Sequence, residues 1–186
     1  MSAKKISPYK RKKEGRTNYK KRLILLKSQK PRLIIRRTNT SIIMQVAEYQ
    51  PSGDRIVCGI NSSALKKLGW NYSCNNLPAC YLAGLLVGKK ALAKKITEAI
   101  PDLGLQTTLP GSRLYAAIKG TIDAGLMMNA SEEVFPSKER LSGEHIAKFF
   151  EANKNKTQFS GYAKQKLNPA KIKDDFEDLK KKITKG

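Results

Sequence analysis

Residues 31–60 read PRLIIRRTNTSIIMQVAEYQPSGDRIVCGI and decide the fold class of this 186-residue chain. Three runs rich in Ile, Val and Leu are separated by Thr38-Asn39-Thr40 and by Pro51-Ser52-Gly53-Asp54, which have the composition of tight turns. Short apolar runs joined by such turns predict consecutive antiparallel strands. We therefore expect a three-stranded meander, with strands starting at Pro31 and spanning 41–49 and 55–60.

Downstream of the meander the apolar residues change to helical spacing. Potential capping residues and turn residues mark the ends of the expected elements. We expect a helix at 18–28 capped by Thr17, a short helix capped by Asn61 or Ser62 and ending at Gly69, a longer helix capped by Asn75 or Asn76 and ending near Ala99, a strand at 103–107, a helix capped by Ser112 and ending near Ala124, and later helices at 143–152 and 169–183. The order β-β-β-α-β-α predicts an α/β fold in which helices pack on a mixed sheet.

The charge of the chain is strongly positive and uneven. The net charge is +22, and the first 37 residues hold fifteen Lys and Arg side chains against one acid, Glu14. Such a field favours an anionic partner, which means nucleic acid, an anionic membrane or an acidic protein. A basic arm ahead of a folded domain is typical of proteins that bind phosphates. We expect three parts: an arm (1–15), an α/β domain (16–126) and a C-terminal extension (127–186).

Motifs for enzymatic chemistry fail on their spacing. Gly84 to Lys89 resembles a phosphate loop but has three residues between the glycines instead of four, so it predicts close helix-on-sheet packing. Cys58, Cys74 and Cys80 lack zinc-site spacing and are expected to be free thiols. His145 is the only histidine, and we expect a structural role. No catalytic residue, cofactor, metal or small-molecule substrate is therefore expected.

Membrane association is also disfavoured by the pattern. The longest apolar run, 79–87, is far shorter than the roughly 20 residues of a spanning helix. No export signal is visible at the charged N-terminus. A membrane-surface protein would need a basic amphipathic helix with Trp or Phe opposite the charges, and the arm offers only Tyr.

Six segments of the sequence together resemble a known family. The chain is similar to the archaeal form of the large-subunit ribosomal protein of universal family eighteen, whose eukaryotic relative is large-subunit protein five. The segments are Arg16–Tyr19 with Arg22-Leu23, Lys30–Leu33, Asn76–Leu86, Pro110–Ala116 with Lys119-Gly120 and Asp123–Leu126, Ser131–Pro136, and Gly143–Ala147. Phe159–Tyr162 also fits the archaeal-eukaryotic tail.

The resemblance implies a non-enzymatic protein on the cytoplasmic ribosome. It implies binding to 5S rRNA, anchoring of that RNA at the central protuberance, and contacts with large-subunit rRNA and neighbouring ribosomal proteins. Asn129-Ala130 stands where Pro-His is expected, which leaves no imidazole at that place. The missing basic C-terminal extension of eukaryotic members points to an archaeal-type chain. The alternative is an RNA-processing or RNA-modifying enzyme, which would need a cofactor loop or clustered acid–base residues.

The expected RNA contacts combine basic, hydroxyl, amide and aromatic side chains, which suit phosphates, riboses and unpaired bases. On strand 32–37, alternation places Arg32 and Arg36 on one face around an exposed or partly covered Ile34, and Leu33 and Ile35 on the other. Gly111-Ser112-Arg113 opens a helix, whose free amides favour phosphate. The full set is Lys10, Arg11, Lys12, Lys13, Arg16, Thr17, Asn18, Tyr19, Arg22, Arg32, Arg36, Arg37, Asn39, Ser112, Arg113 and Lys119.

Overall fold

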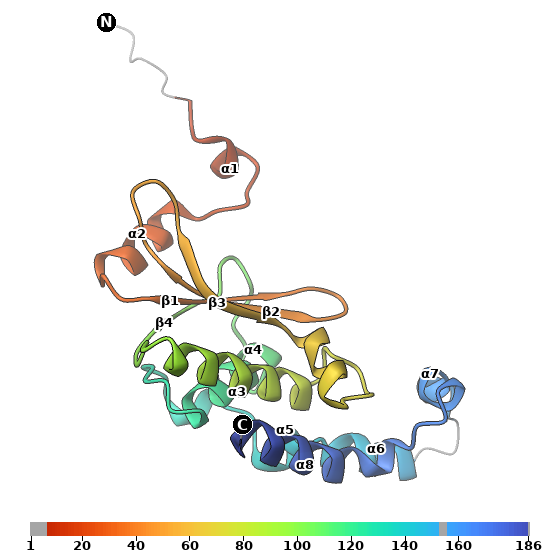
Figure 1. The fold of residues 1–186 in the computed structure, drawn as a ribbon. Helices are drawn as coiled ribbons and strands as arrows, with labels where there is room; N and C mark the ends of the chain where they lie inside the picture. The colour runs from red at the N-terminus through yellow and green to blue at the C-terminus, as the bar shows by residue number, and fades with distance from the viewer. Residues whose placement is uncertain (1–6, 153–155, 186) are drawn as a thin grey trace, which may run out of the picture.

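The computed structural model describes residues 7–152 and 156–185 and contains one four-stranded sheet (Figure 1). The strands are β1 (Arg32–Arg37), β2 (Ile42–Glu48), β3 (Arg55–Asn61) and β4 (Ile100–Asp102), in the order β3-β2-β1-β4. β1, β2 and β3 pair antiparallel, while β4 is parallel to β1. The predicted α/β class, mixed sheet and meander are confirmed.

The fourth strand lies three residues earlier than the predicted strand at 103–107. The Ile100 amide donates to the Pro31 carbonyl at 2.9 Å and aligns β4 with β1. Gly104 then adopts φ +61°, a left-handed conformation that turns the chain out of the sheet. Residues 103–107 therefore form a loop, although their apolar–polar alternation is typical of a strand.

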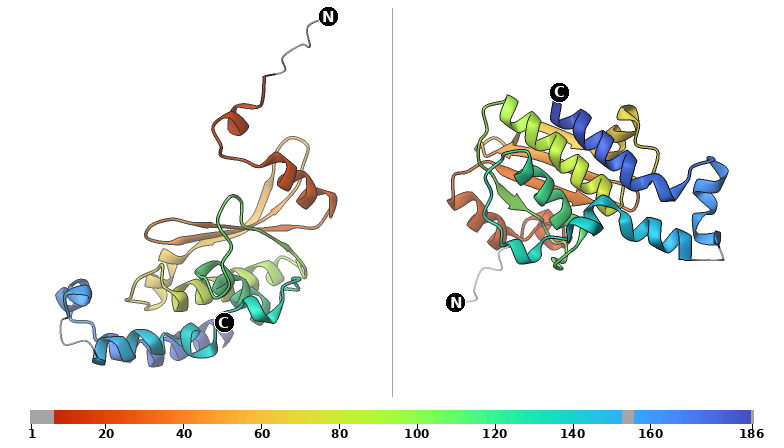
Figure 2. Two further views of the ribbon diagram at one scale, coloured as in Figure 1. Left: turned by 180° about the vertical axis from the view of Figure 1, so that it is seen from behind. Right: turned by 90° about the horizontal axis from the view of Figure 1, so that it is seen from below.

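The helices occupy both sides of the sheet but mainly one. They are α1 (Lys10–Lys13), α2 (Tyr19–Lys27), η1 (Ser62–Leu68), α3 (Leu77–Ala93), α4 (Arg113–Asp123), η2 (Glu132–Val134), α5 (Lys138–Ser142), α6 (Glu144–Ala152), η3 (Lys156–Phe159), α7 (Ser160–Lys164), η4 (Pro169–Lys171) and α8 (Ile172–Lys185). α3 and α4 cover one sheet face and α5, α6 and α8 lie beyond them, with α8 beside α3 (Figures 1 and 2). α1 and α2 lie on the opposite side of the sheet.

The structure corrects some predicted helix ends and decides between alternatives at others. Asn76, not Asn75, caps α3, because its Oδ1 accepts from the Ala79 amide at 2.9 Å. α3 ends at Ala93 rather than near Ala99, since Lys95 takes φ +63° and breaks the helix. Asn18, not Thr17, caps α2, with Oδ1 accepting from the Lys21 amide at 3.0 Å.

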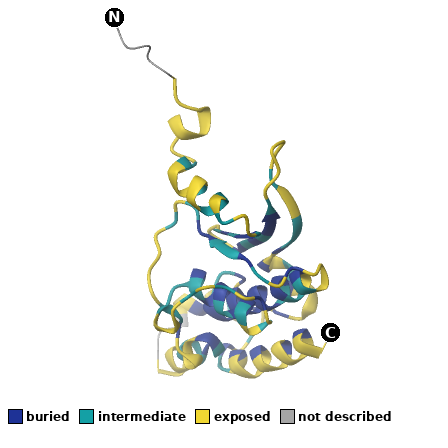
Figure 3. Cartoon of the chain, turned by 90° about the vertical axis from the view of Figure 1, so that its left-hand side faces the viewer, coloured by how far each residue is buried: buried dark blue, intermediate teal, exposed yellow. Residues whose placement is uncertain are grey.

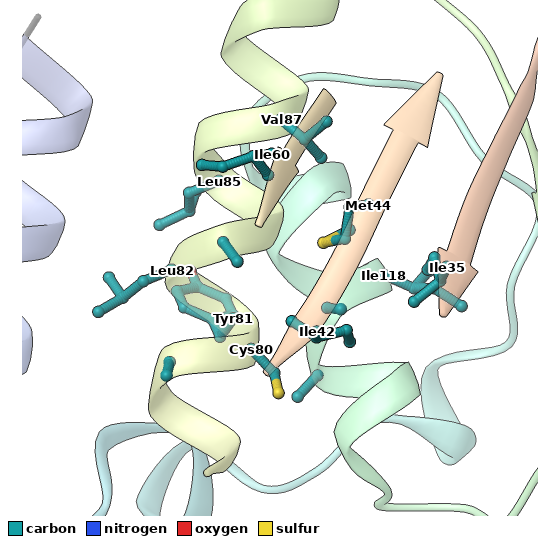
Figure 4. Packing of buried hydrophobic residues seen from close by; sticks show 14 of the residues in the cluster. Ile35, Ile42, Met44, Ile60, Cys80, Tyr81, Leu82, Leu85, Val87 and Ile118 are labelled. Atoms are coloured by element: carbon teal, nitrogen blue, oxygen red, sulfur yellow. The ribbon is translucent and has the colours of Figure 1, made fainter. Parts of the chain in front are cut away.

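The core lies between the sheet and α3–α4. Ile35, Ile42 and Met44 from the strands face Cys80 and Ile118 from the helices (Figure 4). Leu33 and Ile35 are fully buried, as strand alternation predicts. Apolar side chains of α8 (Ile172, Phe176, Leu179 and Ile183) join the same cluster. α8, in the C-terminal extension, is thus part of the same core.

Two glycines set the close crossing of α3 and α4. A Cβ at Gly84 would lie 2.1 Å from the Ala117 carbonyl oxygen, and one at Gly120 would lie 2.1 Å from the Tyr81 carbonyl oxygen. Gly84 therefore allows close packing of α3 on α4. The prediction that it packs against the sheet was wrong. In the described ranges, no helix is long and apolar enough to cross a membrane.

Candidate nucleic-acid interface

A cavity of about 930 Å³ lies between the N-terminal segment, α2, β1 and the loop after β4. We call it the arm groove. Its lining includes seven of the predicted RNA contacts: Arg11, Arg16, Thr17, Asn18, Tyr19, Arg22 and Arg36. Lys21 of α2, Leu105 and Gln106 also line it and are not among the predicted contacts. Leu105 and Gln106 were missed because residues 103–107 were expected to form a strand. Residues 7–15 of the arm and much of α2 are exposed to solvent (Figure 3).

Local contacts within residues 9–19 hold the described part of the arm beside this groove. Thr17 Oγ1 accepts a hydrogen bond from Arg11 Nε at 3.1 Å. The rings of Tyr9 and Tyr19 pack with centroids 5.2 Å apart and planes inclined by 34°. Tyr9 is 73% exposed, so this aromatic pair presents a surface on which an unpaired base can stack. Lys10, Lys12 and Lys13 lie exposed on the same turn as Arg11.

The floor of the groove is a chain of three arginines and two carboxylates. Arg22 Nη2 donates to Asp54 Oδ1 and Oδ2 at 2.9 and 3.0 Å, and Arg32 Nη2 lies 2.6 Å from Asp54 Oδ2. Arg32 Nη1 donates to Asp102 Oδ2 at 2.9 Å, and Arg36 Nη2 donates to Asp102 Oδ1 at 3.1 Å. We call these five residues the arginine–aspartate network. Three guanidinium groups against two carboxylates leave it positive.

The charge state of Asp54 is fixed by its neighbours. Burial by itself raises the pKa of this carboxyl, but the hydrogen bonds and charges of Arg32 and Arg22 outweigh it and hold the pKa below its ordinary value. The carboxylate is therefore ionised at neutral pH, and the network is intact there. Because the folded-state pKa is depressed, its contribution to stability is lost as the pH falls below about 4.

Arg32 is predicted to contact RNA, but its side chain is buried. It is 1% exposed at the centre of the network, whereas Arg36 on the same sheet face is 41% exposed. Ile34 between them is half-buried. Arg32 thus acts as the buried centre of the network, and Arg36 is the arginine that this sheet face presents to a ligand.

This burial makes a stability prediction for β1. Arg32→Ala leaves Asp54 and Asp102 without their shared partner, although Arg22 and Arg36 still compensate part of the charge. We expect a loss of about 2 kcal/mol of unfolding free energy in urea denaturation. Arg37→Ala, at the exposed end of the same strand, should change it by less than about 0.5 kcal/mol. Equal stability of the two variants would contradict a structural role for Arg32.

A second group of predicted residues meets at the tip of the β1–β2 hairpin. Asn75 Nδ2 donates to the carbonyls of Thr38 and Asn39 at 3.2 and 2.8 Å. Arg113 Nη1 donates to the Asn75 carbonyl at 3.0 Å. Arg113 at the start of α4 therefore braces the hairpin tip, where Asn39 and Arg37 are exposed.

Buried Cys80 lies behind this hairpin tip. Burial raises the pKa of the Cys80 thiol to about 12, although the nearby charges of Arg113 and Arg37 lower it. The thiol is therefore protonated at neutral pH. Cys58 and Cys74 are also free, as the sequence predicts.

Besides buried Arg32, five predicted contacts neither line the arm groove nor belong to the group at the hairpin tip: Lys10, Lys12, Lys13, Ser112 and Lys119. Ser112 is the N-cap residue of α4, but its Oγ is buried and has no hydrogen-bond partner among the described residues. Lys119 Nζ lies 3.2 Å from Asp123 Oδ1 and 5.3 Å from the centre of the Phe135 ring. Lys119 is thus engaged within the fold, on the part of α4 farther from its N-terminus.

An α/β domain with a positive groove, an exposed aromatic pair and a net charge of +22 is typical of nucleic-acid-binding proteins. The chain belongs to the family of ribosomal large subunit proteins 60S L5 and 50S L18, whose model matches residues 5–100. The matched segment contains the described arm, α2, β1 to β3 and α3. The resemblance noted in the sequence is confirmed: this is an RNA-binding structural protein of the large ribosomal subunit.

Proposed function

We propose that the protein binds 5S rRNA and helps to anchor it to large-subunit rRNA in the central protuberance. The observation that carries the proposal is the convergence of seven predicted contact residues on the arm groove. Its guanidinium groups suit phosphates, since they neutralise charge and release counterions. Its amide and hydroxyl groups suit riboses and base edges, and the Tyr9–Tyr19 pair suits an unpaired base. The choice of 5S rRNA comes from the family resemblance.

The three expected parts of the chain fit this function as follows. Residues 1–15 and the groove contact the 5S rRNA backbone, and the domain 16–126 holds the groove and the hairpin tip in place. In the C-terminal extension, α8 packs on the domain, and exposed lysines are offered to large-subunit rRNA or neighbouring proteins. The structural role of the family favours this reading over an RNA-processing or RNA-modifying enzyme.

A competition titration tests the proposal. Labelled 5S rRNA is titrated with the full chain, and unlabelled 5S rRNA or transfer RNA is added as competitor at moderate salt. We expect 5S rRNA to compete at least about 100-fold better, since specific binding exceeds non-specific binding by roughly 10³ or more for well-defined sites. Equal competition by transfer RNA would contradict a 5S rRNA function and favour a general RNA-binding role.

A further inference from the structure

Helix α2 forms one wall of the arm groove but has little apolar anchorage. The helix is described in full, has nine residues and contains no buried residue. Leu23 and Ile24 point outward, 58% and 68% exposed, and Leu25 and Leu26 are only half-buried. Helices this short are marginal in water unless tertiary contacts hold them. Contacts with the rest of the fold must therefore fix the position of α2.

Two polar contacts supply that anchorage. Arg22 Nη2 donates to both oxygens of Asp54 at 2.9 and 3.0 Å, and Lys21 Nζ donates to the Gly104 carbonyl at 3.2 Å. Asp54 lies at the end of the β2–β3 turn and is itself held by buried Arg32. The Arg22–Asp54 pair is only partly exposed, at 32% and 22% for the two side chains. It thus links a surface helix to the buried centre of the sheet.

The same pair leaves donors for a ligand. Both hydrogen bonds from Arg22 to Asp54 start at Nη2, so Nη1 and Nε are not used by this pair. At the other end of the network, Asp102 accepts from Arg36 Nη2, and the Asp102 carbonyl accepts from Arg36 Nη1 at 2.6 Å. Both groove arginines are therefore held before a ligand arrives, which reduces the conformational entropy lost on binding.

A carboxylate in an RNA site is unfavourable on charge alone, because it repels phosphates. Asp54 and Asp102 nevertheless lie in the lining of the arm groove. We propose that Asp54, assisted by Asp102, is a positioning residue for RNA binding that fixes α2 and the Arg22 guanidinium in the geometry RNA recognises. The inference rests on the proposed function. It adds two acidic residues, Asp54 and Asp102, to an RNA site that is otherwise basic.

The decisive variant is Asp54→Asn, with Glu151→Gln as its control. Each removes one negative charge, but Glu151 lies exposed on α6, outside the arm and the arm groove. We expect Asp54→Asn to weaken 5S rRNA binding about fivefold, because preorganisation is lost, while heparin binding stays equal or tightens. Glu151→Gln should bind both equally or slightly more tightly. Tighter 5S rRNA binding by Asp54→Asn would show that charge dominates and would overturn the proposal.

Hydrogen–deuterium exchange of the free protein tests the positioning without RNA. In Asp54→Asn, exchange should rise in residues 19–27 and remain unchanged in α3, which shows that the domain is folded. Glu151→Gln should exchange like the wild type in both segments. Unchanged exchange in residues 19–27 of Asp54→Asn overturns the inference even if the wild type prefers 5S rRNA. If exchange in residues 19–27 of Asp54→Asn rises but the wild type does not prefer 5S rRNA over transfer RNA, the positioning role of Asp54 stands and only the proposed function is contradicted.

Discussion

Gly84→Ala is expected to destabilise the protein by about 3 kcal/mol or more, which lowers the melting temperature by roughly 6–12 °C. The new Cβ would meet the backbone oxygen of Ala117 at 2.1 Å, where no side chain can rotate away. α3 and α4 must then separate, and the apolar packing between them loosens. Thermal unfolding monitored by circular dichroism measures the effect.

Gly161→Ala provides the control for this substitution. Gly161 lies in α7, and nothing approaches the position of its missing Cβ within 4 Å among the described residues. Alanine also favours a helix over glycine. We expect equal or slightly higher stability for Gly161→Ala. If Gly84→Ala melts at the wild-type temperature, the crossing of α3 and α4 can accommodate a methyl group at Gly84, which would contradict the account.

Deletion of residues 1–15 is expected to weaken 5S rRNA binding on the order of 100-fold at low salt. The segment carries six basic residues and one acid, a net charge of +5, and it includes Arg11 and Tyr9. The slope of log affinity against log salt should shrink by roughly 0.7–0.9 for each phosphate that the shortened chain no longer neutralises. Filter binding or fluorescence anisotropy at several salt concentrations gives both quantities.

A charge-matched control shows whether the position of the positive charges in the arm matters, or only the number of charges removed. Five exposed lysines of the C-terminal extension can be changed to Gln, which removes the same net charge: Lys164, Lys166, Lys171, Lys181 and Lys182. We expect this variant to lose much less affinity than the deletion. Equal losses and equal slopes would mean that the arm acts only through the net charge of the chain.

Local sequence signals were sufficient for most of the sheet. The turns at 38–40 and 51–54 mark the strand ends because their residues favour tight turns wherever they occur. β4 was misplaced, since a three-residue parallel strand is defined by its pairing with β1, a contact between segments far apart in the sequence. The end of α3 was misplaced because the left-handed conformation of Lys95 has no signal in its residue type.

The candidate site was predictable in its composition but not in its geometry. Charge density identified the arm, and strand alternation correctly put Arg32 and Arg36 on one face. The burial of Arg32 depends on Asp102, which is 70 residues away in the chain, and no local pattern connects the two. Gln106 lines the groove because the loop after β4 folds over β1, where Gln106 Nε2 donates to the Ile35 carbonyl at 3.4 Å. The local sequence does not predict this loop path.

The identity of the RNA that the protein holds in cells tests the central claim most directly. The tagged 186-residue chain is cross-linked to RNA by ultraviolet light and purified under denaturing conditions, and the attached RNA is sequenced. We predict that 5S rRNA is the most enriched RNA, with large-subunit rRNA second, and that the arm deletion removes most of the 5S rRNA signal. Enrichment of transfer RNA or messenger RNA without 5S rRNA would contradict the account.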